Sequence, residues 1–160
     1  MRPFILTALI LMASPAMAGE TLSGSYLCIR EEAAGLAYNT ISKHWVSTTF
    51  VAKDRFVLGL KLVDLDLQHE QDAVREYSVQ ITPVGTSNPE ACIPQKSGLS
   101  LHLSRDAPSF ECTGLTSIVD YTFNLKTLRY LSSYIYGYVS GDDTNAQTPF
   151  VAGGTCTKID

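Results

Sequence analysis

Apolar and polar residues alternate with a period of two along most of this chain, which is the pattern of half-buried β-strands. Residues 56–62 alternate in this way, and the apolar face then shifts by one position at Val63. A shift of one residue within a strand predicts a β-bulge. The same alternation predicts further strands at 77–81, 99–103, 110–112, 119–124, 128–132, 134–138 and 148–157.

The predicted strands define the fold class. About eight to ten short strands, separated by turn residues, favour an all-β domain built as a single small antiparallel β-barrel or β-sandwich. We expect little helix, with single helical turns conceivable only at 31–34 or 71–76. Asn88-Pro89 and Ile93-Pro94 bracket a segment that we predict to be a loop carrying Cys92.

Two segments, 38–45 and 123–130, share one pattern: an aromatic residue, Asn, two residues, a hydroxyl residue, two residues and an aromatic residue. Asn accepts hydrogen bonds from its own turn, and flanking aromatic residues can pair across strands. We therefore predict the same β-hairpin at both places. Chance recurrence of a common hairpin and true pseudo-symmetry both remain open.

The first 18 residues have the order of a secretory signal peptide. Arg2 precedes an apolar run at 4–13, Ser14-Pro15 interrupts it, and Ala16-Met17-Ala18 supplies a small-x-small cleavage site. The apolar run is about ten residues long, whereas a membrane-spanning helix needs about 20. We therefore expect cleavage after Ala18 and a single β domain over 19–160. This domain would lie in the periplasm or the medium and would not span a membrane.

All four cysteines follow Ala18, so export would place them where disulfides form. Three pairings are possible. We favour Cys28–Cys156, which would join the opening strand to the closing strand, and Cys92–Cys112, which would close a short local loop. The alternative, a zinc site, lacks any Cys-x-x-Cys spacing.

Charge and motif content narrow the function classes. The net charge is −4, loss of Arg2 would make it more negative, and no Lys/Arg run is present. This balance argues against nucleic acid or an anionic membrane as a partner. The chain has no Gly-x-Ser-x-Gly motif, and His44, His69 and His102 are isolated in sequence. We therefore expect neither enzymatic activity nor a cofactor.

Aromatic and acidic residues near the C-terminus are the candidate sites. Tyr134, Tyr136 and Tyr138 would share one face of a strand, with Tyr130 nearby, and Trp45 is the only tryptophan. Tyrosine and tryptophan can line a ligand cavity or form a protein-binding face, or they can fill a barrel wall. Oxygen ligands suitable for Ca²⁺ cluster in a second segment, which could equally be a plain acidic turn: Asp142, Asp143 and Asn145.

Several motifs lie at the two ends of the mature chain: Tyr-x-Cys at 26–28, Tyr-Asn…Trp-Val-Ser-Thr-Thr-Phe at 38–50, Phe-Asn…Leu-Arg-Tyr at 123–130, Gly-Tyr-Val-Ser-Gly-Asp-Asp at 137–143, Thr-Pro-Phe at 148–150 and Cys156. In these motifs, the chain resembles a group of uncharacterised small exported proteins of Gram-negative bacteria. The resemblance leaves out the Leu-rich middle, implies a compact exported domain and transfers no activity.

In architecture, the predicted domain also resembles the membrane-bound-type lysozyme inhibitors. Those are small periplasmic β-barrels with a disulfide between the first and last strands. Their Ser/Gly-rich inhibitory loop with a basic residue has only a poor counterpart here, Lys96-Ser97-Gly98. The likeness is therefore one of architecture, which does not carry function.

These observations lead to two functional hypotheses. The first is an exported, non-enzymatic protein-binding module, for example a hydrolase inhibitor, whose contact face is formed by the tyrosines. The second is a lipocalin-like carrier of a small apolar ligand, with the tyrosines and Trp45 lining the cavity.

Overall fold

The computed structural model describes residues 21–65, 75–95, 101–104 and 106–160. Over these residues the fold is all-β, as expected. The strands are β1 (Gly24–Asn39), β2 (His44–Thr49), β3 (Arg55–Leu65), β4 (Arg75–Pro83), β5 (Glu90–Pro94), β6 (Leu101–Leu103), β7 (Ser109–Gly114), β8 (Asp120–Asn124), β9 (Arg129–Tyr134) and β10 (Phe150–Lys158). No helix capable of crossing a membrane occurs in the described ranges.

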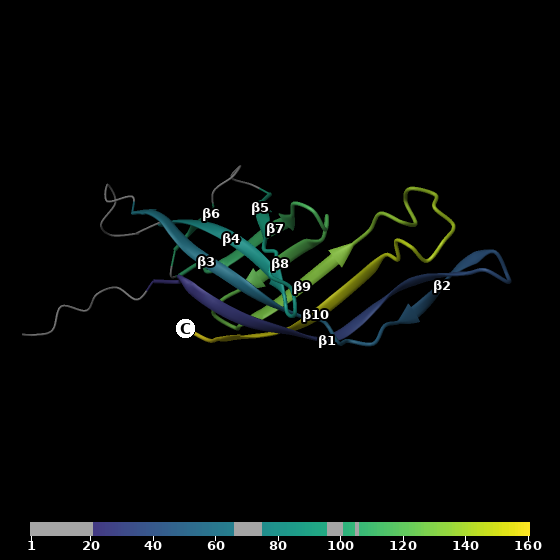
Figure 1. Ribbon diagram of the computed structural model, residues 1–160, viewed down its shortest axis with the longest axis horizontal. Helices are drawn as coiled ribbons and strands as arrows, with labels where there is room; N and C mark the ends of the chain where they lie inside the picture. Colours follow the sequence, from purple (N-terminus) through teal and green to yellow (C-terminus); the bar gives the residue numbers. More distant parts are fainter. Residues whose placement is uncertain (1–20, 66–74, 96–100, 105) are drawn as a thin grey trace, which may run out of the picture.

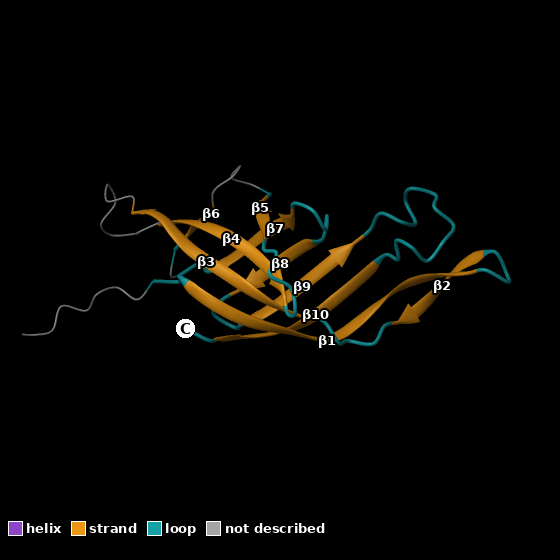
Figure 2. Ribbon diagram, in the orientation of Figure 1, coloured by secondary structure: helices purple, strands orange, loops and turns teal. Residues whose placement is uncertain are grey.

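Eight strands close into an antiparallel barrel, so the structure decides for a barrel over a sandwich (Figures 1 and 2). The order runs β1-β3-β4-β5-β7-β8-β9-β10, and β10 returns to pair with β1 along residues 26–35. Closure leaves no exposed edge among these eight strands. Two further strands are attached to this barrel: β2 pairs with β1, and β6 pairs with β4.

The long first strand carries part of the chain away from the barrel. Residues 24–29 of β1 pair with β3, whereas residues 34–39 pair with β2. The β1–β2 hairpin therefore extends beyond the barrel, and the segment after β9 extends beside it (Figure 1). We call residues 36–49 together with 135–149 the arm.

Inward-facing side chains of the barrel strands pack into one core cluster. Its members alternate along the strands with residues that are less buried, which is the pattern that the period of two predicts. The cluster contains Tyr26, Cys28, Phe56, Leu58, Leu60, Tyr77, Val79, Ile81, Cys92, Leu101, Leu103, Phe110, Cys112, Phe123, Tyr130 and Cys156. Burying each large apolar side chain stabilises the fold by about 1.5–3 kcal/mol.

Both favoured disulfides are present. Cys28 and Cys156 lie directly opposite each other on β1 and β10, so this bond ties the strands that close the barrel. Cys92 on β5 is joined to Cys112 on the neighbouring β7. None of the described cysteines is free.

The predicted bulge and the repeated hairpin are confirmed. The pairing of β3 with β4 shifts between Leu62 and Asp64. Both hairpins have a four-residue loop: β1–β2 closes at Asn39 and His44, and β8–β9 closes at Asn124 and Arg129.

Three local predictions are wrong. Cys92 lies in β5 rather than in a loop, because the prolines around it stand at or outside the strand ends, where a missing N–H is tolerated. Residues 31–34 form no helical turn, since they continue β1 across a register shift between Arg30 and Glu32. Residues 134–138 form no strand, because β9 ends at Tyr134. Residues 71–74 of the other proposed helical turn lie outside the described residues, as do Leu99 and Lys96-Ser97-Gly98.

Candidate functional site

The arm is built on the first of the two matching hairpins. The Asn39 side-chain oxygen accepts hydrogen bonds from the backbone N–H groups of Ile41 and Ser42, both at 3.0 Å. Lys43 completes the turn with a φ of 57°. The turn places Tyr38 opposite Trp45, and their rings meet edge to face with centroids 5.6 Å apart.

The segment that follows β9 is fastened to this hairpin by hydrogen bonds. The Tyr38 N–H donates to Asn145 Oδ1 at 2.7 Å, and Asn145 Nδ2 donates to the Tyr38 carbonyl at 2.9 Å. The Leu36 N–H donates to the Pro149 carbonyl at 3.1 Å. Two segments that lie 107 positions apart in sequence are thus joined by several hydrogen bonds.

Trp45 is the centre of the aromatic packing in the arm. Its indole Nε1–H donates to Asp143 Oδ1 at 3.1 Å, and its ring meets Tyr138 edge to face at 5.8 Å. Tyr138 itself is 54% exposed. The structure therefore brings together two of the predicted site residues, Trp45 and Tyr138, and leaves part of their surface open to a partner.

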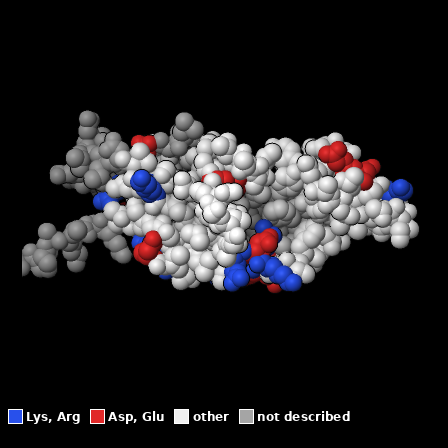
Figure 3. All heavy atoms as spheres, viewed as in Figure 1, with Lys and Arg blue, Asp and Glu red and all other residues white. Residues whose placement is uncertain are grey.

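Further apolar residues of the arm face solvent. Tyr134 stacks on Phe150 and contacts Tyr136, while Tyr136 remains largely exposed. In the view of Figure 3 the arm carries only a few charged side chains, close to its tip. The other exposed apolar side chains of the arm are Ile41, Ile135 and Val139.

Tyr130 lies inside the barrel, whereas Tyr136 and Tyr138 are exposed. It is 3% exposed inside the barrel, where its ring contacts Phe56 and Phe123 with centroids 5.1 and 5.8 Å away. Burial raises the pKa of Tyr130 to about 12, although the nearby Arg30 charge opposes the rise. Tyr130 therefore packs in the core, apart from Tyr134, Tyr136 and Tyr138.

The proposed calcium ligands hold the arm together. Asp143 accepts from Trp45 and Asn145 pairs with Tyr38, so two of the three side chains already have protein partners. Asp142 is exposed. Within the described residues no group of three His, Cys, Asp or Glu side chains could hold a metal ion.

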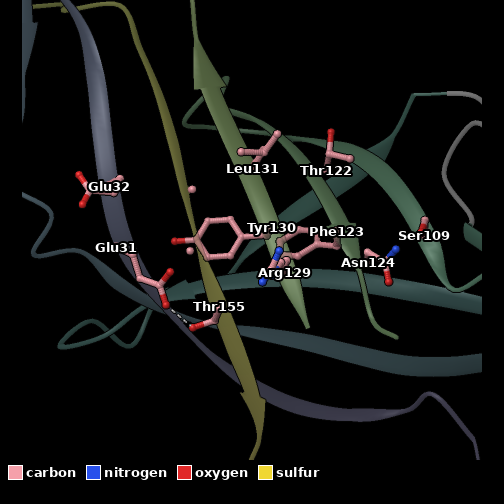
Figure 4. Close-up of a pocket in the computed structure, with 12 residues that line it drawn as sticks. Glu31, Glu32, Ser109, Thr122, Phe123, Asn124, Arg129, Tyr130, Leu131 and Thr155 are labelled. Atoms are coloured by element: carbon pink, nitrogen blue, oxygen red, sulfur yellow. Dashed lines mark hydrogen bonds between the residues drawn. The ribbon is translucent and has the colours of Figure 1, made fainter. Parts of the chain in front are cut away.

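A shallow groove of about 610 Å³ crosses the strands β1, β10, β9 and β8 (Figure 4). Gly153 and Gly154 of β10 are among its lining residues, between β1 and β9. On one side, Glu31 accepts a hydrogen bond from the Thr155 hydroxyl at 2.6 Å. On the other side, Leu131 is exposed. Sequence reasoning missed this groove, although the Gly-Gly pair inside a predicted strand was a signal for it.

A second hollow, of about 320 Å³, lies where β1 leaves the barrel towards the arm. Its apolar walls come from Phe56, Ile81, Pro83, Val84 and Tyr121, and its charged rim from Arg30, Lys53, Asp54 and Arg55. Arg30 Nη1 forms an ion pair with Asp54 Oδ2 at 2.5 Å. In the sequence, the charged run Lys53-Asp54-Arg55 is the signal of this hollow.

The histidines do not form a catalytic cluster in the described part of the chain. His44 Nδ1 lies 3.1 Å from the Ser42 carbonyl in the hairpin turn, and His102 lies on β6. His69 falls outside the described residues.

The fold and its bonds define a disulfide-bonded, eight-stranded antiparallel barrel with an aromatic arm. Comparisons of the chain with protein-family models, curated proteins and solved structures find no match. Inference about function therefore rests on the geometry of these surfaces.

Proposed function

We propose that this protein is an exported, non-enzymatic protein-binding module whose contact surface is the arm. The observation that carries the proposal is the pairing of Trp45 with the half-exposed Tyr138 at 5.8 Å, outside the barrel. Tyrosine and tryptophan supply large contact areas at low cost in conformational entropy, and they are enriched at binding interfaces.

The hydrogen bonds of the arm support this role because they fix its shape before a partner binds. Asn145 and Asp143 fasten the segment 135–149 to the hairpin. A surface held in its bound conformation loses less conformational entropy on association. The exposed tyrosines would thus be presented on a stiff support rather than on a free loop.

The position of β2 also favours a protein partner. It is the last strand in the sheet order, and its pairing with β1 runs without a bulge along residues 44–49. Edge strands are usually blunted by bulges, prolines or charges, and an unprotected one can pair with an extended segment of another protein. The strand sequence His-Trp-Val-Ser-Thr-Thr contains no proline, lysine or acidic residue.

The packing of the barrel core favours the hypothesis of a protein-binding module over that of a ligand carrier. A carrier of an apolar ligand needs interior space, whereas sixteen inward residues here pack against one another in a single cluster. The arm, in contrast, is a narrow projection that would fit a concave surface. An exported hydrolase, whose active site lies in a cleft, is the class of partner that we propose.

Crosslinking tests the proposal directly. A photoreactive amino acid replaces Tyr138 in one version of the protein and Leu115, an exposed residue of the β7–β8 turn, in the control. Both are expressed with the native leader, and the mature N-terminus is sequenced to establish cleavage before Gly19. We expect position 138 to capture a defined exported protein that position 115 does not.

The captured protein is then purified and assayed as a hydrolase with and without this chain. We expect inhibition that the double variant Tyr136→Ala/Tyr138→Ala loses and that Leu115→Ala keeps. Identical crosslinks from both positions would overturn the assignment of the arm as the contact surface. A captured partner without hydrolase activity would overturn the inhibitor role alone.

A further inference from the structure

The hollow at the arm side of the barrel has the size and lining of a small-molecule site. Its volume of about 320 Å³ is at the lower end of the range for ligand pockets, about 300–1,000 Å³. Phe56 and Tyr121 meet edge to face at 5.6 Å and form an aromatic wall. Charged side chains at the rim and apolar side chains in the walls both contribute to the lining, so both kinds of contact are available to a ligand.

The rim is cationic on an acidic protein. Arg30, Lys53 and Arg55 contribute three positive charges against the single carboxylate of Asp54, whereas the whole chain carries −4. Figure 3 shows Lys and Arg side chains gathered around acidic ones at the lower edge of this face, near the place where Figure 1 labels β1. A local excess of one charge in a hollow attracts ligands of the opposite charge.

The backbone holds the rim in place. The Arg30 N–H donates to the Asp54 carbonyl at 3.0 Å, and the Val84 N–H donates to the Arg55 carbonyl at 2.9 Å. These bonds connect Asp54, just before β3, to β1, and Arg55, the first residue of β3, to the residue that follows β4. The cations are therefore mounted on a fixed segment rather than on a free loop.

Arg30 retains hydrogen-bonding capacity. Its ion pair with Asp54 uses Nη1, and its guanidinium lies over the Phe150 ring with Cζ 4.9 Å from the centroid. Arg30 Nε and the Tyr130 hydroxyl are both buried, and Arg30 lies close enough to that hydroxyl to act on the Tyr130 pKa as a hydrogen-bond donor. The guanidinium has further N–H groups beyond Nη1, so a carboxylate brought next to Arg30 would gain a charge-assisted hydrogen bond.

We infer that this hollow binds a small organic carboxylate, with the carboxylate at the Arg30, Lys53 and Arg55 rim and the apolar part against Phe56 and Tyr121. Guanidinium groups match carboxylates in geometry as well as in charge. The apolar wall distinguishes such a ligand from an inorganic anion. None of the residues that line this hollow belongs to the arm. A test of this site is therefore independent of the proposed function.

Calorimetric titration of the mature protein with benzoate tests the inference. Benzamide has the same ring without the charge, and inorganic phosphate has the charge without the ring. We expect benzoate to bind at one site per chain and the two other compounds to bind at least about tenfold more weakly, because each lacks one of the two interactions. Equal binding of phosphate, equal binding of benzamide or no binding of benzoate would each overturn the inference.

Matched variants locate the site. Lys53→Gln/Arg55→Gln removes exposed rim charges without touching the core, and Lys126→Gln removes an exposed charge from the β8–β9 turn. We expect the rim variant to weaken benzoate binding about tenfold or more, while Lys126→Gln changes it less than about twofold. Circular dichroism establishes that both variants are folded. A similar loss in Lys126→Gln would show that benzoate responds only to net charge, and no loss in the folded rim variant would show that benzoate does not bind at the rim. Either result would overturn the site.

Discussion

The side-chain amide of Asn145 pairs with both backbone polar groups of Tyr38, a residue 107 positions earlier in the chain. It accepts from the N–H and donates to the carbonyl, as a residue of a neighbouring strand would. One side chain thus continues the edge of the sheet beyond the point where β10 ends its pairing with β1, at Gly35. This contact joins the two halves of the arm.

Replacing Asn145 should loosen the arm without unfolding the barrel. Asn145→Ala removes two hydrogen bonds, worth about 1–2 kcal/mol together. We expect faster hydrogen exchange at the Tyr38 amide and a red shift of Trp45 fluorescence, while the barrel amides keep their protection. Gln147→Ala, in the same segment and exposed, is the control. Unchanged exchange at Tyr38 in Asn145→Ala would contradict the assigned role.

The two matching hairpins should respond oppositely to glycine at the same turn position. Lys43 and Leu128 have φ values of 57° and 55°, which are unfavourable for residues other than glycine. Lys43 is exposed, so Lys43→Gly should stabilise the protein by up to about 1 kcal/mol. Leu128 packs against the core, so Leu128→Gly should be destabilising by about 1–3 kcal/mol. Denaturant unfolding measures both, and equal effects would show that packing of Leu128 is unimportant.

Local features of this fold could be predicted from the sequence because short-range chemistry sets them. The Asn residues of both hairpins accept the same two turn hydrogen bonds, Asn39 from Ile41 and Ser42 and Asn124 from Lys126 and Thr127. The bulge at Val63 follows from the shift in the apolar face. Of the three possible cysteine pairings, the favoured one is present because it joins the opening strand to the closing strand, but the sequence alone left the other two open.

The arm and the two hollows could not be predicted, because they depend on contacts between distant segments. The period of two continued through Tyr134, Tyr136 and Tyr138, yet this segment leaves the sheet and packs against Trp45 instead. From the sequence alone, Arg30 would be expected to be an exposed, charged residue. The register shift of β1 and the course of residues 53–55 place it at the barrel end.

The two disulfides should differ in their contribution to stability. In the chain-entropy model, the Cys28–Cys156 bond, with a sequence separation of 128, stabilises by about 5 kcal/mol, and the Cys92–Cys112 bond, with a separation of 20, by about 3 kcal/mol. We expect Cys28→Ser/Cys156→Ser to lower the free energy of unfolding more than Cys92→Ser/Cys112→Ser. Urea titration of both variants measures the difference, and the reverse order would reject chain entropy as the dominant effect.

Glu90 should make stability depend on pH at acidic values. Burial raises its pKa, but hydrogen bonds from the side chains and backbone of Thr116 and Ser117 outweigh burial, so the pKa is lowered from 4.5. A carboxyl with a depressed pKa in the folded state stabilises above its unfolded pKa, and this contribution is lost as pH falls through the folded pKa. Glu90→Gln should therefore be less stable than wild type at about pH 7, and the gap should narrow below about pH 4. A gap independent of pH would contradict this assignment.

Adjacent glycines of β10 should differ sharply in their tolerance of alanine. A Cβ on Gly154 would overlap the carbonyl oxygen of Ile29 on β1 and lie 2.9 Å from Cε1 of the Tyr130 ring. Because backbone and a buried ring cannot both move aside, Gly154→Ala should be destabilising by about 3 kcal/mol or more.

A Cβ on Gly153 would come closest to Leu131 Cδ2, at 3.3 Å, and this side chain is exposed and can turn away; its other neighbour, the Tyr130 carbonyl oxygen, lies at an ordinary contact distance of 3.7 Å. Gly153→Ala should therefore change stability by less than about 1 kcal/mol, helped by the smaller entropy of its unfolded chain. Thermal unfolding of the two variants side by side gives the comparison. Equal stabilities of the two variants would contradict the close packing of Gly154 against the Ile29 carbonyl and the Tyr130 ring.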